Sequence, residues 1–284
     1  MRRLAIDLSA NSIRVVEGAM GGPMRCGATA VPDGAMEAGR IHDPAAVARE
    51  LRPLLARNEI TQTRAMVAAA DTLGTFRILN VPTAATPKDI DATIARELQF
   101  DPQRTATRWL DLGQISGGRK VYAVAWDRAL LKNVVEAVRQ ASLEPVVVEL
   151  KSASVTRLVP TATCIVVDLS RQLAELILVD GHLPHVWHSF VAPEPLTDDA
   201  AAAVARPIRS MLRFYRRSSD GEWGRLAPVF VAAEQDLKQK VLTGIADMVG
   251  QPVRVLPPPP RVPPEIRHTT YLGCLGLLMR RRVG

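Results

Sequence analysis

Residues 4–9 read LAIDLS and residues 165–170 read IVVDLS, so an apolar run that ends in Asp, a second apolar residue and Ser occurs twice, 161 residues apart. At the same offset, the polar turn after each run is followed by another apolar run, at residues 13–16 and 174–177. An apolar strand, a polar turn and a second apolar strand, repeated in register, indicate a chain built from two related halves.

The aspartates that end these runs are the first candidate functional residues. A strand of small aliphatic side chains is typically buried on both faces, so we expect Asp7 and Asp168 to emerge only where their strands end. Related halves usually face each other across a cleft, which would place the two carboxylates opposite one another. Paired hairpins of this kind are typical of the actin, Hsp70 and sugar-kinase folds. There, backbone N–H groups hold the phosphates of a nucleotide and an Asp holds the water shell of its magnesium ion. The alternative is that both aspartates simply end their strands.

The order of predicted elements indicates an α/β fold with two lobes. Residues 1–160 form the first lobe, and residues 161–284 form the second. Within the first lobe, residues 75–143 follow the order strand, helix, strand, strand, helix, which is typical of an inserted α+β subdomain.

Three polar residues predict where helices begin. Asp43 and Thr86 each precede a proline, the usual arrangement of an N-cap followed by proline at the first helical position, and Asp127 precedes an amphipathic segment. Two further prolines lie inside predicted helices; we expect Pro53 to kink or shorten its helix and Pro207 to interrupt its helix.

Composition limits the class of protein. The chain has 284 residues, of which 47% are hydrophobic and 23% charged, enough for a core in each lobe. No stretch approaches the ~20 consecutive apolar residues of a membrane-spanning helix, and no signal-peptide pattern is present, so we expect a cytosolic protein. The cysteines Cys26, Cys164 and Cys274 lack CxxC spacing, which favours buried thiols over disulfides or a zinc site.

The chain is basic, with a net charge of +7 and a pI near 9.8, which suits an anionic partner. Lipid headgroups, nucleic acid and an acidic protein surface all fit this charge. Aromatic residues make up only 4% of the chain, which argues against a stacking surface for single-stranded nucleic acid.

At the level of whole motifs, the sequence resembles a known family. Residues 7–17, DLSANSIRVVE, are similar to the first phosphate loop of PilM-like proteins, the actin-like proteins of type IV pilus assembly, which are related to FtsA and to the cytoplasmic domain of GspL. Residues 39–44 (GRIHDP), 76–82, 143–149 (LEPVVVE) and 271–277 (YLGCLGL) follow the order of that family.

The resemblance implies a duplicated actin-like, ribonuclease H-like fold with two lobes and a scaffolding function. We expect a cytoplasmic scaffold at the inner face of the cell membrane, in a type IV pilus or a related secretion or DNA-uptake machine. Its expected partners are the N-terminal tail of a PilN-like inner-membrane protein and other platform proteins, with peripheral membrane contact and no nucleic acid; self-association is left open. The tail would dock where the inserted subdomain, residues 75–143, meets the core of the first lobe, with main-chain hydrogen bonds to a strand edge.

The resemblance also implies that the nucleotide cleft is degenerate. Ser9 and Ser170 stand where the family usually has glycine, and FVAAE at residues 230–234 replaces a strand that ends in Gly-Gly. Residues 197–228 leave room for only one helix and a loop, so we expect most of the extra subdomain of the second lobe to be missing. We therefore expect no bound ATP or Mg²⁺, no metal site, no catalytic residue and no enzymatic turnover. The residues of the degenerate cofactor site are Asp7, Ser9, Asn11, Ser12, Asp168 and Ser170.

The alternative function is an ATP-binding actin-like ATPase or a small-molecule kinase of the same fold. Such an enzyme needs a general base with partners, and the sequence offers none; neither phosphate loop contains a lysine. His182, His185 and His188 suggest a metal site, but His185 and His188 would point to opposite faces of a strand.

A third alternative is a membrane-tethered actin homologue of the division machinery, with residues 275–282 as the anchor. We favour a simpler interpretation, in which these apolar side chains pack on the second sheet and the arginines stabilise the last helical turn.

Overall fold

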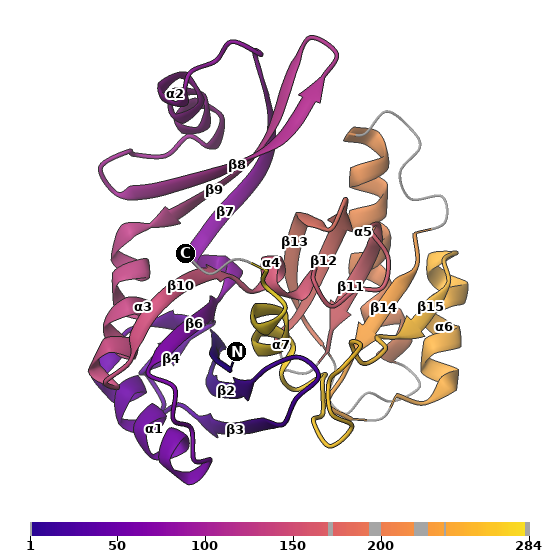
Figure 1. Cartoon of the computed structure of the whole chain (residues 1–284). Coiled ribbons are helices and arrows are strands. Elements are labelled where there is room, and N and C mark those ends of the chain that lie inside the picture. Colours follow the sequence, from indigo (N-terminus) through magenta and orange to yellow (C-terminus); the bar gives the residue numbers. More distant parts are fainter. Residues whose placement is uncertain (1, 170–172, 193–199, 219–226, 236, 282–284) are drawn as a thin grey trace. The chain divides into compact units, whose positions relative to one another are not determined.

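The computed structural model describes residues 2–169, 173–192, 200–218, 227–235 and 237–281 (Figure 1). It contains two compact units. The first consists of the described parts of Met1–Gly18, Arg25–Lys151 and Arg281–Gly284, and the second consists of the described parts of Ala19–Met24 and Ser152–Arg280.

The first unit is built on a five-stranded sheet in the order β10-β6-β1-β2-β3. β1 pairs antiparallel with β2 and parallel with β6, and β10 pairs parallel with β6. The strands are β1 (Arg3–Ala10), β2 (Ser12–Gly18), β3 (Met24–Ala30), β6 (Arg64–Ala69) and β10 (Glu144–Leu150).

The core of the first unit lies between this sheet and two helices, α1 (Pro44–Arg57) and α3 (Arg128–Gln140). The apolar stripes of both helices and the side chains of β1 meet there, because β1 is a run of small aliphatic residues with six consecutive buried positions. Fully buried members of this core are Leu4, Ile6, Val15, Val47, Leu51, Val67, Val134 and Val138.

The inserted part of the first unit is a three-stranded antiparallel sheet in the order β7-β9-β8. Its elements are β7 (Gly74–Val81), α2 (Pro87–Leu98), β8 (Thr105–Ile115) and β9 (Gly118–Asp127). Helix α2 covers one face through Ile90 and Ile94, which pack against Leu79, Val121 and Ala123. A small second core therefore holds this sheet and α2 together. Short elements complete the first unit: β4 (Met36–Glu37), β5 (Arg40–Ile41) and the 3₁₀ helix η1 (Asp71–Leu73).

The second unit contains a five-stranded sheet in the order β13-β12-β11-β14-β15. α5 and α6 pack on one face, and α4 and α7 pack on the other. The elements are α4 (Lys151–Val155, shared with the first unit at Lys151), β11 (Cys164–Asp168), β12 (Leu173–Asp180), β13 (Leu183–Val191), α5 (Ala200–Ser218), β14 (Val229–Ala232), α6 (Gln239–Val249), β15 (Val253–Val255) and α7 (Leu272–Leu278). Between β13 and β14, α5 is the one element in the described residues.

The two sheets confirm that the halves are related. Read from β15, the second sheet has the order of the first read from β10, with β11 in the place of β1. The antiparallel registers also agree at the offset of the sequence repeat: Asp7 is opposite Arg14, and Asp168 is opposite Glu175. The parallel neighbours continue the match, since Asp7 lies beside Ala68 and Asp168 lies beside Ala232. The repeated sequence therefore encodes a repeated strand pairing.

The predicted helix starts are confirmed. The side chain of Asp43 accepts a hydrogen bond from Ala46 N at 2.9 Å, that of Asp127 accepts bonds from Ala129 N and Leu130 N, and Thr86 forms a reciprocal capping box with Asp89.

The expected interruption at Pro207 and the expected shortening at Pro53 are wrong, whereas a kink at Pro53 stays a prediction. α1 continues to Arg57 and α5 continues to Ser218. Each proline leaves one carbonyl without its helical donor, on Arg49 and Ala203, and neither residue is buried. Water can satisfy these carbonyls, so the helices continue through both prolines.

The last helix is an inner element of the second unit. Every residue of α7 is buried, and Leu272 and Leu275 pack against Val166 and Ile177 of the second sheet. The expected packing of these apolar side chains on the second sheet is therefore confirmed. The expectation that arginines stabilise the last helical turn is wrong, because α7 ends at Leu278 and its last turn contains no basic residue. Within the described ranges, no helix is both long and apolar enough to cross a membrane.

Candidate functional site

The first predicted phosphate loop is the hairpin of β1 and β2. Asn11 lies in its turn and Ser12 begins β2. The expectation that Asp7 ends its strand is wrong, because β1 continues past Asp7 and Ser9 to Ala10. Asp7 is 1% exposed and Ser9 is 6% exposed. Ser9 donates its backbone N–H (2.9 Å) and its hydroxyl group (2.5 Å) to Oδ1 of Asp7. The strand pairing is irregular between Asp7 and Ala10, which gives the chain room to fold back in this way.

A short hairpin packs against this loop. β4 and β5 are joined by Ala38 and Gly39, which both have positive φ (47° and 77°), as a two-residue hairpin turn requires. A Cβ atom on Gly39 would lie 2.1 Å from Cβ of Ala70 and 2.8 Å from the carbonyl oxygen of Ser9. The backbone of the hairpin tip is therefore in direct contact with the loop, and Thr72 fixes it by donating to Ala38 O at 3.0 Å.

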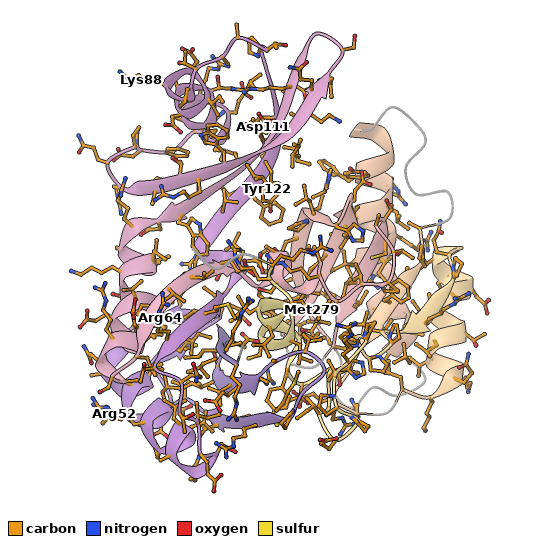
Figure 2. All side chains as sticks on the ribbon, in the orientation of Figure 1. Arg52, Arg64, Lys88, Asp111, Tyr122 and Met279 are labelled. Carbon is orange, nitrogen blue, oxygen red and sulfur yellow. The ribbon has the colours of Figure 1, made fainter. Side chains whose placement is uncertain are left out.

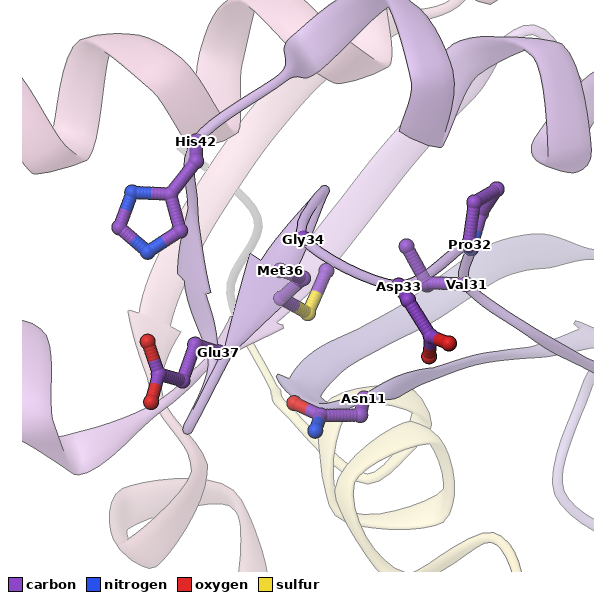
Figure 3. A pocket seen from close by; sticks show the side chains of 8 residues that line it. All are labelled: Asn11, Val31, Pro32, Asp33, Gly34, Met36, Glu37 and His42. Carbon is purple, nitrogen blue, oxygen red and sulfur yellow. The ribbon is translucent and has the colours of Figure 1, made fainter.

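A pocket of about 230 Å³ lies beside the same loop (Figure 3). Asn11 is the one predicted site residue that lines it; neither Asp7 nor Ser9 does. The rest of the lining combines an apolar floor with exposed polar side chains. It consists of Val31, Pro32, Asp33, Gly34, Met36, Glu37 and His42. With two carboxylate groups in its wall, this pocket is poorly suited to a phosphate.

The second predicted loop follows β11. Asp168 is 3% exposed and ends the strand as expected, and Leu169 N donates to Ala232 O at 2.7 Å. Ser170 lies outside the described residues. Opposite Asp168 stands Glu175, at the position that Arg14 occupies in the first hairpin, so the cross-strand neighbour of the aspartate has changed from basic to acidic.

The predicted site residues therefore form two groups. Asp7, Ser9, Asn11 and Ser12 share one hairpin of the first unit, and Asp168 lies in the second unit. The facing arrangement of Asp7 and Asp168 stays a prediction. In the strand where a Gly-Gly pair is expected, Ala232 and Ala233 are buried, at 0% and 7% exposure.

Sequence reasoning missed a buried carboxylate at the far end of the first hairpin. Glu17 is fully buried on β2. Its Oε1 accepts hydrogen bonds from Thr61 N (2.8 Å), Thr61 Oγ1 (3.1 Å) and Gln62 N (2.7 Å). Its Oε2 forms an ion pair with Arg2 at 3.0 Å. Burial by itself raises the pKa of Glu17, but these hydrogen bonds and the Arg2 charge outweigh it, so the pKa lies below its ordinary value. This is a structural contact that joins β2 to the start of β6.

The inserted sheet presents a second candidate surface on the face that α2 leaves uncovered. Side chains alternate between the faces of a strand, so the neighbours of Leu79 and Val121 point away from α2. In Figure 2, Lys88 marks α2 on one side of the sheet and Tyr122 lies on the other. We call this surface the insert face; it consists of Phe76, Ile78, Leu110, Tyr122 and Val124.

The burial of the side chains differs along the insert face. Phe76 and Val124 pack against the core of the first unit, whereas Leu110 is 57% exposed. Between them, the Tyr122 ring lies 5.9 Å from that of Phe76. Tyr122 is only 7% exposed, and its hydroxyl group has no hydrogen-bond partner among the described residues. Burial, and then the charges of Asp71 and Glu149, raise the pKa of this hydroxyl well above its usual range.

In the part of the chain that the structure describes, no group of three or more His, Cys, Asp or Glu side chains could hold a metal ion. Of the three histidines at residues 182–188, His185 shares a hydrogen bond of 2.9 Å between its Nδ1 and the hydroxyl of Tyr215. Cys164 is buried, and this raises the pKa of its thiol to about 12.

No protein-family model and no curated protein sequence matches the chain. Solved structures do. A chain of the PilM–PilN type IV pilus biogenesis complex matches with a TM-score of 0.75 at 18% identity, covering 98% of each chain. The cytoplasmic domain of EpsL, an inner-membrane component of the type II secretion system of Vibrio cholerae, matches with a TM-score of 0.59 at 11% identity, covering 100% of this chain and 97% of that one.

A third match is the ethanolamine utilization protein EutJ from Carboxydothermus hydrogenoformans, with a TM-score of 0.55 at 13% identity, covering 98% of this chain and 89% of that one. Similarity extends over almost the whole chain in all three cases, and the duplicated sheets supply its physical basis. The chain therefore has the actin-like ATPase fold, in the α/β form that it shares with a chain of the PilM–PilN complex.

Proposed function

We propose that this protein is a cytoplasmic scaffold of a type IV pilus or a related secretion machine, that it binds the N-terminal tail of a PilN-like inner-membrane protein, and that it is not an enzyme. The observation that carries the proposal is the match to the PilM–PilN complex over 98% of both chains. The match to the cytoplasmic domain of EpsL, a part of another inner-membrane secretion platform, supports the same type of function.

The insert face is the surface we propose for the tail. β8 is an edge strand of the inserted sheet, so one side of its main chain has no neighbouring strand among the described residues. An extended tail can add main-chain hydrogen bonds at such an edge while apolar pockets take alternate side chains. Leu110 lies on this edge strand, and the buried Tyr122 hydroxyl opposite it has no hydrogen-bond partner among the residues that the structure describes.

The geometry of the first hairpin supports a cleft that no longer holds nucleotide. A phosphate loop works through backbone N–H groups that are free to bind oxygen. The N–H of Ser9 instead donates to Oδ1 of Asp7. A phosphate would have to displace a carboxylate from this donor and would then meet its negative charge, which argues against ATP and Mg²⁺ as cofactors and against the alternative of an ATPase or kinase.

The test is calorimetric titration of the purified chain with a synthetic N-terminal tail of a PilN-like protein encoded nearby, with a scrambled tail as the control. We expect a Kd of about 1 μM, which corresponds to roughly −8 kcal/mol. Leu110→Asp should weaken the tail at least tenfold because it places a charge in the apolar contact. The matched variant Val255→Asp changes a similarly exposed residue of β15, in the second unit, and should leave the affinity unchanged.

Each part of the proposal has its own contrary result. No binding of any such tail would overturn the scaffold assignment. Equal losses in Leu110→Asp and Val255→Asp would remove the insert face from the contact. Micromolar binding of Mg-ATP in a separate titration would overturn the degenerate cleft and favour the ATPase alternative.

A further inference from the structure

One face of α5 in the second unit is strongly basic. Arg206, Arg209 and Arg213 are all exposed, and their spacing of three and four residues places them within about 60° of one another around the helix axis. The buried stripe of the helix lies on the other side and packs on the second sheet. It consists of Val204, Ile208, Met211, Leu212 and the partly buried Tyr215.

The charge of this face is not compensated within the described chain. None of the three arginines forms an ion pair or a hydrogen bond with a described residue. α5 also contains no Asp or Glu between Ala200 and Ser218. In the first unit, by contrast, Arg2 and Arg119 pair with carboxylates. The three arginines are therefore exposed and have no acidic residue on their own helix to offset their charge.

An exposed aromatic ring lies beside these arginines. Phe214, which follows Arg213 directly in the sequence, is 66% exposed. On the helix it lies about 80° from Arg206 and about 60° from Met211, between the arginines and the edge of the buried stripe. Arginines next to an exposed apolar ring are a typical composition of a surface that lies on the headgroup region of a membrane.

We propose that this surface, the α5 basic face (Arg206, Arg209, Arg213 and Phe214), binds an anionic phospholipid membrane. Guanidinium groups bind phosphate oxygens well, and a planar lipid surface requires no shape beyond the row of charges that α5 presents. The contact goes beyond the proposed function, since it does not involve the insert face or a tail.

The experiment is flotation of the full chain with vesicles of phosphatidylcholine that contain about one third phosphatidylglycerol, and with vesicles of phosphatidylcholine alone. The wild-type chain is expected to float with the anionic vesicles and to dissociate as salt rises, because the contact is electrostatic. Each arginine should contribute about fivefold to the partition constant, so the variant Arg206→Ser/Arg209→Ser/Arg213→Ser should lose about 100-fold.

A matched variant separates this face from the net charge. Arg57→Ser/Arg128→Ser/Arg139→Ser removes the same charge from exposed residues of the first unit whose side chains form no hydrogen bond or ion pair with the described residues. It should lose far less binding than the α5 variant. Both variants should keep the melting temperature of the wild type, because none of the six side chains packs in a core.

Three results would overturn the proposal. They are no flotation of the wild-type chain, equal losses in the two variants, and binding of duplex DNA that the α5 variant loses while its vesicle binding is kept. The last result would assign the face to nucleic acid. Tail affinity measured with the α5 variant should equal that of the wild type, so failure of the lipid contact and failure of the scaffold assignment are distinguishable.

Discussion

Ser9 donates two hydrogen bonds to a single oxygen of Asp7, from its backbone N–H at 2.9 Å and from its hydroxyl group at 2.5 Å. The first hairpin is closed on itself by this contact. The serine therefore does more than fill the place of a glycine: it gives the buried aspartate a partner inside its own loop.

Ser9→Ala is expected to destabilise the protein by about 1–2 kcal/mol, because it removes one donor from a carboxyl group that is 1% exposed. Urea unfolding followed by circular dichroism measures the change. Ser12→Ala on the same hairpin is the control and should stay within about 0.5 kcal/mol of the wild type. Equal effects would mean that the Ser9 hydroxyl contributes nothing of its own.

Gly39→Ala is expected to cost more than about 2 kcal/mol, since the added methyl group would meet Ala70 and the carbonyl of Ser9 in a left-handed backbone conformation. Gly34 has nearly the same φ (78°), but a Cβ there would meet nothing within 4 Å. Gly34→Ala therefore measures the backbone cost alone, about 1 kcal/mol. Similar unfolding free energies for the two variants would contradict the close approach of the hairpin tip to the loop.

Glu17 is expected to make stability depend on pH. Its folded-state pKa is lowered, so its contribution is present above the unfolded value of 4.5 and is lost as the pH falls through the folded value. At pH 7, Glu17→Gln should cost about 1–3 kcal/mol, and the difference from wild type should shrink as the pH falls below 4.5. Glu144→Gln breaks an exposed pair with Arg64 at 3.4 Å and should change stability by less than about 0.5 kcal/mol at any pH. A pH-independent difference for Glu17→Gln would contradict the lowered pKa.

Tyr122→Phe is expected to leave stability unchanged or to raise it by about 1 kcal/mol, because it removes a buried hydroxyl that has no partner in the described chain. Tyr215→Phe is the matched substitution of opposite sign: it breaks the bond to His185 Nδ1 and should cost about 0.5–1.5 kcal/mol. Thermal unfolding of the two variants side by side decides the matter, and a clear loss for Tyr122→Phe would reveal a partner for its hydroxyl.

The duplicated frame could be predicted from the sequence because it depends on local patterns. The apolar runs before Asp7 and Asp168 identify β1 and β11, and the constant offset between the halves reappears as identical strand register. The caps Asp43, Thr86 and Asp127 were equally readable, since an N-cap acts on residues two or three positions away.

The contacts that decide the chemistry of the site could not be predicted. That Gly39 meets Ser9, and that Thr61 satisfies Glu17, depends on segments some 30 to 45 residues apart, about which periodicity says nothing. The prediction that Pro207 interrupts its helix was wrong for a related reason. The cost of a proline inside a helix follows from the sequence, whereas the packing of α5 on the second sheet, which stabilises a continuous helix, does not.

The inner position of α7 has a consequence for how the second unit is made. Its leucines complete the core around Val166 and Ile177, which are synthesised roughly 100 residues earlier. Until α7 arrives, one face of β11 and β12 is an exposed apolar surface of the kind that aggregates. A chaperone, or rapid release of the finished chain, is therefore of most use to this protein in the interval between the synthesis of β12 and that of Leu275.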